Sequence, residues 1–224
     1  MTVIPFDTSA QPVVIAETKP ERVVVPVPAA DAPAIVRSLA DFEIAGDYAA
    51  ALKATLRDVA DLSESDREKL VAWLEARKDS TAFPTLFMLA RTHQDAGRGE
   101  DAAKWYMAGS LMGLIDAARF GDGSASNAVR EVEAQFSDIR QRLRQDSTPR
   151  LQAATFSLEI EEQLASRQAP LWIAARAQSA VAGDPTPLLA PADWEAKGKN
   201  YHDMFRGFVE RAGKMSVVEL VWDF

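Results

Sequence analysis

Residues 84–113 constrain the fold of this chain more than any other stretch, because they carry two helical patterns separated by a short glycine turn. The stretch reads PTLFMLARTHQDAGRGEDAAKWYMAGSLMG, and its apolar residues recur every three or four positions on both sides of Gly97. Small side chains at Ala90 and Ala102 let two helices approach closely, and the ring of Tyr106 fills the space between them. The stretch therefore predicts an antiparallel helix pair.

Helical periodicity continues through most of the chain from Asp31 onward, with glycine and proline between the periodic segments. Asp31 is a candidate cap for the first helix, and Ser65 with Glu68 forms the pattern of a capping box. The expected helices cover residues 31–45, 48–59, 65–78, 84–96, 98–112, 113–121, 129–143, 151–167, 170–182 and 193–212. We predict an all-α protein, an irregular α-solenoid or helical array of antiparallel helix pairs with about nine or ten helices.

The two ends of the chain differ from its middle. Residues 1–30 are rich in Val and Pro and predict an extended arm, because proline removes amide donors and fixes φ. Residues 31–183 form the expected helical array, and residues 184–191 form a proline-rich loop. Residues 192–224 form a final helix and an apolar tail, MSVVELVWDF, which we expect to pack on the array. Pairing of the tail with the arm, or with an edge of another chain, is the alternative.

Composition excludes several classes of protein. The 224 residues carry a net charge of -8, which disfavours nucleic acid and anionic membranes as general partners. No window has the roughly 18 apolar residues that span a bilayer, so no membrane insertion is expected. The chain has 0 Cys, which excludes disulfides and Cys-ligated zinc. Its first residues do not resemble a secretory signal, so we expect a cytoplasmic protein. A periplasmic or secreted location stays open if an upstream signal is removed.

One cluster of positive charge stands out in this acidic chain. It consists of the arginines at positions 140, 142, 144 and 150, near the end of one expected helix. We interpret them as cations that complement the helix macrodipole.

Catalytic motifs are missing from the sequence. His93 and His202 each lack a second histidine at metal-ligand spacing, and we interpret His93 as a helix-packing residue. The glycines of DAGRGED lack the preceding strand that a dinucleotide site requires, and the carboxylates at 159, 161 and 162 are typical of a solvated helix face. We therefore expect no enzyme, no cofactor and no metal.

The residues of the helix pair resemble the tetratricopeptide repeat and its Sel-like relatives. The matching positions are Leu86, Leu89, Ala90, His93, Ala102 and Tyr106, with Gly97 in the turn. A second set, at Ile35, Leu39, Phe42, Gly46, Tyr48 and Ala51, falls at corresponding offsets within residues 34–61.

The resemblance implies protein binding through a concave surface lined by the first helix of each pair. Carried over by position, the groove residues would be Phe87, Arg91 and Gln94, with Val36 and Glu43 from the second set. Trp222 in the tail is a further candidate contact. The sequence predicts a non-enzymatic adaptor, assembly factor or subunit that binds a peptide or helix of a protein partner, its oligomeric state left open. The alternatives are an enzyme with scattered carboxylates and histidines in a helical cleft, and a toxin-neutralising or chaperone protein with an acidic blocking surface.

Overall fold

Helices form at nearly every segment with helical periodicity in the computed structural model, which describes residues 27–79, 82–121, 123–164, 173 and 189–212. The α-helices of this part of the chain are α1 (Ala34–Ile44), α2 (Tyr48–Asp58), α3 (Glu64–Glu75), α4 (Pro84–Asp95), α5 (Gly99–Ala117), α6 (Ser126–Ala134), α7 (Ser137–Gln145), α8 (Ser147–Leu164) and α11 (Pro191–Ala212). Two short 3-10 helices lie at Val59–Asp61 and Gly123–Ala125. Since the described residues contain no strand, the predicted all-α class is confirmed.

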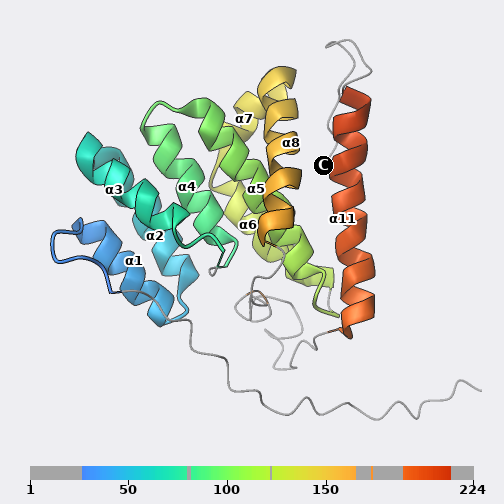
Figure 1. Ribbon diagram of the computed structural model, residues 1–224, viewed down its shortest axis with the longest axis horizontal. Helices are drawn as coiled ribbons and strands as arrows, with labels where there is room; N and C mark the ends of the chain where they lie inside the picture. The colour runs from blue at the N-terminus through green and yellow to red at the C-terminus, as the bar shows by residue number, and fades with distance from the viewer. Residues whose placement is uncertain (1–26, 80–81, 122, 165–172, 174–188, 213–224) are drawn as a thin grey trace, which may run out of the picture.

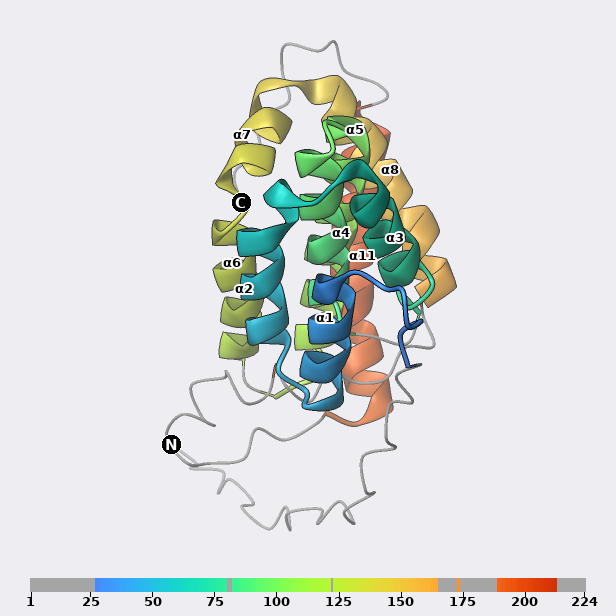
Figure 2. The same ribbon diagram turned by 90° about the vertical axis from the view of Figure 1, so that its left-hand side faces the viewer.

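The helices stack side by side from α1 at one end to α11 at the other (Figure 1). Viewed along that row, α4 and α5 lie in the middle, with α2, α6 and α7 on one side and α3 and α8 on the other (Figure 2). Helix α5 packs against α4, α6, α7, α8 and α11. It is buried around most of its circumference, as expected for a helix that is apolar on nearly every side. The solenoid arrangement itself stays a prediction.

The expected antiparallel pair is present as α4 and α5. Gly97 joins them with a φ of +74°, a left-handed conformation that favours glycine. Ala90 and Ala102 are fully buried at the contact, and Tyr106 meets Phe87 edge to face with 5.4 Å between ring centroids. The packing reasons for these residue types are confirmed, while the likeness to tetratricopeptide repeats stays a prediction.

The prediction that one helix ends near residue 112 and another begins at 113 is wrong. Helix α5 runs without a break through Gly109 and Gly113. A Cβ at Gly109 would lie 2.8 Å from the ring of Phe87, and one at Gly113 would lie 3.0 Å from Val129. These glycines are sites of close helix contact, so they do not end a helix.

The long helix expected over residues 129–143 is divided into α6 and α7. Phe136, between them, has φ -118° and ψ 39°, which is outside the helical region. Its fully buried ring lies 5.2 Å from that of Phe87 and 6.2 Å from that of Tyr106. We attribute the break to this packing, which brings a large ring into the core.

The expected helix caps are also corrected. Ser63, and not Ser65, begins α3: its hydroxyl accepts a hydrogen bond from the amide of Asp66 at 3.1 Å. The first helix begins after Pro33 with no side-chain cap, and Asp31 instead pairs with Lys69 at 3.1 Å. The final helix is confirmed as α11.

Several expected segments lie outside the described residues. They are most of the arm at 1–30, most of the loop at 184–191, the helix at 170–182 except for Ile173, and the tail at 213–224 with Trp222.

Candidate functional site

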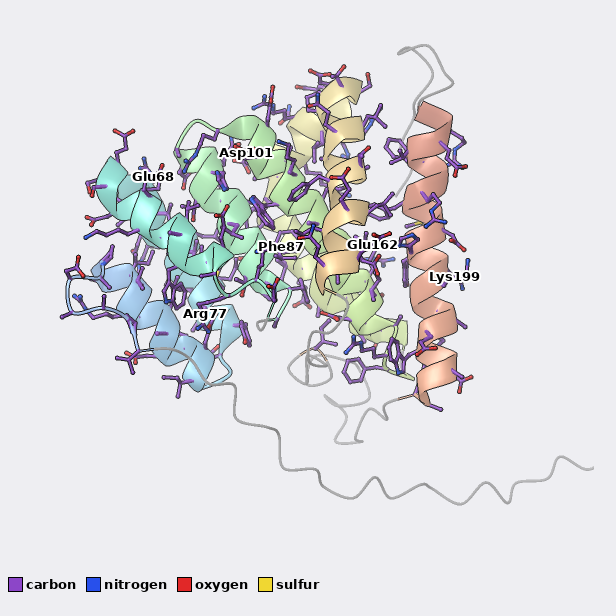
Figure 3. All side chains as sticks on the ribbon, viewed as in Figure 1. Glu68, Arg77, Phe87, Asp101, Glu162 and Lys199 are labelled. Atoms are coloured by element: carbon purple, nitrogen blue, oxygen red, sulfur yellow. The ribbon has the colours of Figure 1, made fainter. Side chains whose placement is uncertain are left out.

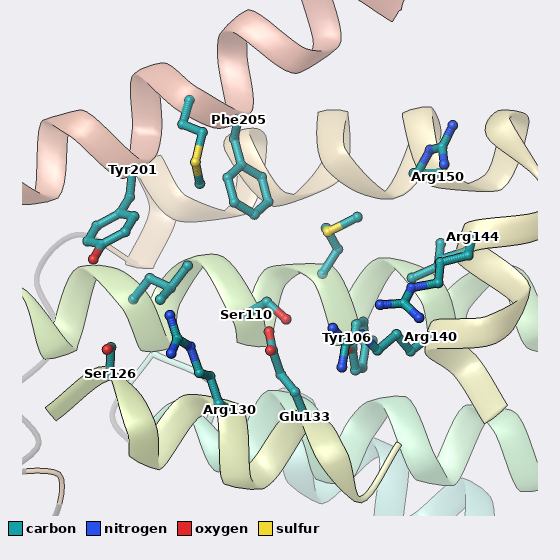
Figure 4. Close-up of a pocket in the computed structure, with 14 residues that line it drawn as sticks. Tyr106, Ser110, Ser126, Arg130, Glu133, Arg140, Arg144, Arg150, Tyr201 and Phe205 are labelled. Carbon is teal, nitrogen blue, oxygen red and sulfur yellow. The ribbon is translucent and has the colours of Figure 1, made fainter. Parts of the chain in front are cut away.

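A groove of about 620 Å³ lies along α5, bounded by α6 and α7 on one side and by α11 and the start of α8 on the other (Figure 4). Its apolar lining comes from Met107 and Leu114 of α5, Leu143 of α7, and Met204 and Phe205 of α11. Its polar lining is formed by Tyr106, Ser110, Ser126, Arg130, Glu133, Arg140, Arg144, Arg150 and Tyr201.

The charge of the groove opposes that of the chain. Four guanidinium groups and one carboxylate, that of Glu133, line it and give a net charge of +3, whereas the whole chain carries -8. Arg130 and Arg144 are exposed and Arg140 is half-buried. None of these three forms an ion pair with a carboxylate of the described residues. Among the described residues their charges are therefore not neutralised by an ion pair.

Local structure explains why these arginines share one wall. Arg140 and Arg144 stand one turn apart on α7, so they project from the same face. Arg130 projects from α6, which precedes α7 along the same side of α5. The break at Phe136 buries an aromatic ring between the two helices and leaves the arginines on either side of it facing the groove.

Arg150 is held more firmly than the other three. Its residue is 5% exposed, and its guanidinium lies over the ring of Phe208 from α11, 5.8 Å from the ring centroid. Burial lowers the pKa of Arg150, but an arginine keeps its charge at any ordinary pH. The groove thus has one fixed cation at the start of α8 and three more exposed ones on α6 and α7.

Tyr106 supplies a neutral polar group to the groove. Burial raises the pKa of its phenol well above the ordinary value, and the carboxylate of Glu133 raises it further. The phenol therefore keeps its proton and can donate a hydrogen bond. Such a group suits recognition of an acceptor oxygen and does not suit proton abstraction at neutral pH.

The two histidines of the chain both lie between helices. No group of three or more His, Cys, Asp or Glu side chains among the described residues could hold a metal ion. His93 lies buried between helices, where burial lowers its pKa. His202 bonds through Nδ1 to Glu161 at 2.8 Å and through Nε2 to Arg206 at 2.7 Å, and so links α11 to α8. Over the same residues no helix is long and apolar enough to cross a bilayer.

Three of the sequence-predicted groove residues are in the interior, so their expected role is corrected. Phe87 is fully buried at the centre of the stack (Figure 3), in contact with the rings of Phe83, Tyr106 and Phe136. Val36 is 2% exposed and packs in the same core. Glu43 is buried and forms an ion pair with Arg77, which ties α1 to the end of α3. The first helices of both pairs turn these faces inward because a further helix covers them.

The other three predicted residues have different outcomes. Arg91 pairs with Asp138 at 3.0 Å and with Asp95 at 3.5 Å, so its charge is used within the fold to join α4 to α7. Gln94 is half-buried and does not line the groove. Trp222 lies outside the described residues. The structure thus does not bring the six predicted residues together in one surface.

Sequence reasoning identified the basic residues at 140, 144 and 150 but assigned them to a helix end, and it missed Arg130. Arg144 does lie in the last turn of α7. The signal of a shared site was the contrast between this basic cluster and the acidic chain. No family model, curated protein or solved structure matches this chain.

Proposed function

We propose that the protein is a non-enzymatic binding module whose groove takes an acidic, amphipathic segment of a protein partner. The observation that carries the proposal is the row of Arg130, Arg140 and Arg144 beside an apolar floor, with no carboxylate partner among the described residues. Arginines left without partners bind carboxylates through paired N–H donors. The apolar floor supplies affinity and the arginines fix register.

A peptide suits the groove better than a small anion, because its charges are spread along its length. Arg130 lies on α6, whereas Arg140 and Arg144 lie on α7, on the other side of the break at Phe136. Acidic residues one or two turns apart on a bound helix would meet successive arginines. The side chains of Met107, Met204 and Phe205 would contact the apolar face of such a helix.

The chemistry of the lining favours binding over catalysis. Acid–base catalysis needs two titratable groups with pKa values driven apart and placed near one reacting atom. Among the described lining residues, Tyr106 is held neutral and Glu133 is the carboxylate. Neither has the histidine or the second carboxylate that such a pair requires.

Fluorescence anisotropy with a labelled amphipathic peptide of about 16 residues, which spans about 24 Å as a helix, tests the proposal. One peptide carries Glu on its polar face and Leu and Phe on the other, and its matched partner carries Lys in place of Glu. We expect the acidic peptide alone to bind, with an affinity that falls as salt rises. Arg144→Glu should weaken binding by about tenfold or more, equivalent to about 1.4 kcal/mol.

Arg57→Glu is the matched control, because Arg57 is exposed on α2 and does not line the groove. It makes the same charge reversal and should leave binding unchanged. Equal binding of the Glu and Lys peptides, or equal loss in the two variants, would refute the proposal. The proposal would also be refuted if the protein bound a single-stranded oligonucleotide but not the acidic peptide, because the arginines would then bind phosphate groups.

A further inference from the structure

We infer that the tail of this chain, residues 213–224, occupies the groove in cis and competes there with a partner segment. The inference combines the position at which α11 ends, the side-chain chemistry of the groove and the residue pattern of the tail. It rests on the same site as the proposed function and names what fills that site when no partner is bound.

The end of α11 lies beside the mouth of the groove. Helix α11 ends at Ala212, and Phe208, one turn earlier, lies against Arg150, which lines the groove. The chain therefore leaves α11 at the Arg144 and Arg150 end. The tail has 12 residues, which extend up to about 40 Å, and the groove wall consists of α6 and α7, each of 9 residues and so about 14 Å long. The tail can turn back and still follow the whole wall.

The tail alternates in a way that matches the two sides of the groove. In an extended segment, Glu219 and Asp223 project to one face, while Leu220, Trp222 and Phe224 project to the other. The two carboxylates are then about 13 Å apart, so each can meet a different arginine of the wall that α6 and α7 form. One face of the tail thus complements the arginines and the other the apolar floor.

Burial also favours this placement. Residues 215–224 include seven apolar side chains, namely Met215, Val217, Val218, Leu220, Val221, Trp222 and Phe224. Such a segment is costly to leave in water. The apolar floor formed by Leu143, Met204 and Phe205 is the recess next to the point where α11 ends.

The absence of native cysteine allows a clean test in the full-length chain. A single cysteine is introduced in one of two variants, Leu220→Cys or Val221→Cys. Position 221 is on the opposite face of an extended tail, so Val221→Cys keeps the apolar side chains of Leu220, Trp222 and Phe224. Ile44→Cys is the matched control, because Ile44 is 69% exposed. We expect each tail thiol to react with a disulfide reagent at a rate at least about tenfold lower than that of the control thiol, because the tail would occupy the groove most of the time.

Two further variants locate the tail. Arg130→Glu together with Arg144→Glu should raise the reactivity of the tail thiol severalfold, whereas Arg57→Glu should not change it. A chain with both Met204→Cys and Leu220→Cys should form an intramolecular disulfide on mild oxidation, and a chain with Ile44→Cys and Leu220→Cys should not. Tail thiols as reactive as the control overturn the inference. The inference is also overturned if the tail thiols react slowly and Arg130→Glu with Arg144→Glu does not change their rate, because the tail would then be covered at another place.

Peptide binding separates this inference from the proposed function. Leu220→Ser with Trp222→Ser should raise the affinity of the acidic peptide severalfold, because the competitor is weakened. In one outcome the tail thiols react slowly and the arginine substitutions speed their reaction, but neither the wild type nor the variant with Leu220→Ser and Trp222→Ser binds the acidic peptide. The proposed function then fails and the inference stands. If both chains bind the peptide equally and the tail thiols react fast, the inference fails and the proposed function stands.

Discussion

The close contact between α4 and α5 can be tested by the same substitution at two glycines. Gly109 lies within α5 and Gly198 within α11, so Gly→Ala removes the same excess backbone freedom from the interior of a helix in both cases. That removal stabilises a helix by about 1 kcal/mol. The surroundings of the added methyl group then decide the sign of the change in stability.

At Gly198 the new Cβ would meet Ile115 at 3.6 Å, which is an ordinary contact, so Gly198→Ala should stabilise the protein by up to about 1 kcal/mol. At Gly109 it would lie 2.8 Å from two ring carbons of Phe87. That ring is held by Phe83, Tyr106 and Phe136, whose centroids lie 5.9, 5.4 and 5.2 Å away, and it cannot withdraw. Overpacking of this kind costs about 1–3 kcal/mol. We therefore expect Gly109→Ala to be about 1–3 kcal/mol less stable than Gly198→Ala.

Urea denaturation followed by circular dichroism measures both free energies of unfolding. Adding Phe87→Leu to Gly109→Ala supplies an internal check, since the smaller side chain makes room for the methyl group. The double variant should lose less stability than the sum of the single variants, because the two positions are in contact. Equal stabilisation by Gly109→Ala and Gly198→Ala would refute the reasoning that α4 and α5 approach at this point.

The remaining predictions concern the first three helices. Glu43→Ala should destabilise the fold by about 3–5 kcal/mol, because Arg77 loses its buried carboxylate, whereas Glu43→Leu with Arg77→Met should be near neutral; thermal unfolding distinguishes them. Burial raises the pKa of the Glu43 carboxyl group more than Arg77 lowers it. The protonated carboxyl group therefore adds to the free energy of unfolding below about pH 4.3, and this contribution is lost as the pH rises through the raised pKa. Urea titrations should accordingly find wild type losing stability relative to Glu43→Gln above that pH, and a constant difference would contradict the shift. Ser63→Ala should cost about 1 kcal/mol of unfolding free energy and Ser65→Ala much less, because Ser63 is the cap of α3.

Local pattern predicted which segments are helical, because amphipathic periodicity and glycine turns act within a few residues. The turns at Gly46 and Gly97 adopt the positive φ that the pattern required. The local pattern failed where a contact with a residue far away in the sequence determines the backbone conformation. Phe136 leaves the helical conformation to pack against Phe87, 49 positions earlier. Gly113 reads as a helix end in sequence, yet it is a point of contact with Val129.

The candidate site was harder to predict than the fold, because its parts come from five helices. Periodicity alone could not tell which faces of α1 and α4 are covered, so Glu43 and Phe87 were assigned to a surface although both are buried. Ion pairing was equally hidden: the partner of Arg91 is Asp138, on α7. Arg130 and Arg150 join Arg140 and Arg144 only when α6, α7 and α8 have folded around α5.

The arrangement of charge gives the strongest reason to regard the groove as functional. Arg140 and Arg144 are like charges one turn apart, an arrangement that destabilises a helix by about 0.2–0.5 kcal/mol. Arg91, on the neighbouring α4, shows that this fold can neutralise an arginine with carboxylates from its own helices. Arg130, Arg140 and Arg144 have no such ion pair with a carboxylate of the described residues, although the chain has 33 acidic residues. Folding stability alone does not account for a cationic groove in an acidic protein, whereas the proposed binding of an acidic segment would, because its carboxylates would remove the repulsion.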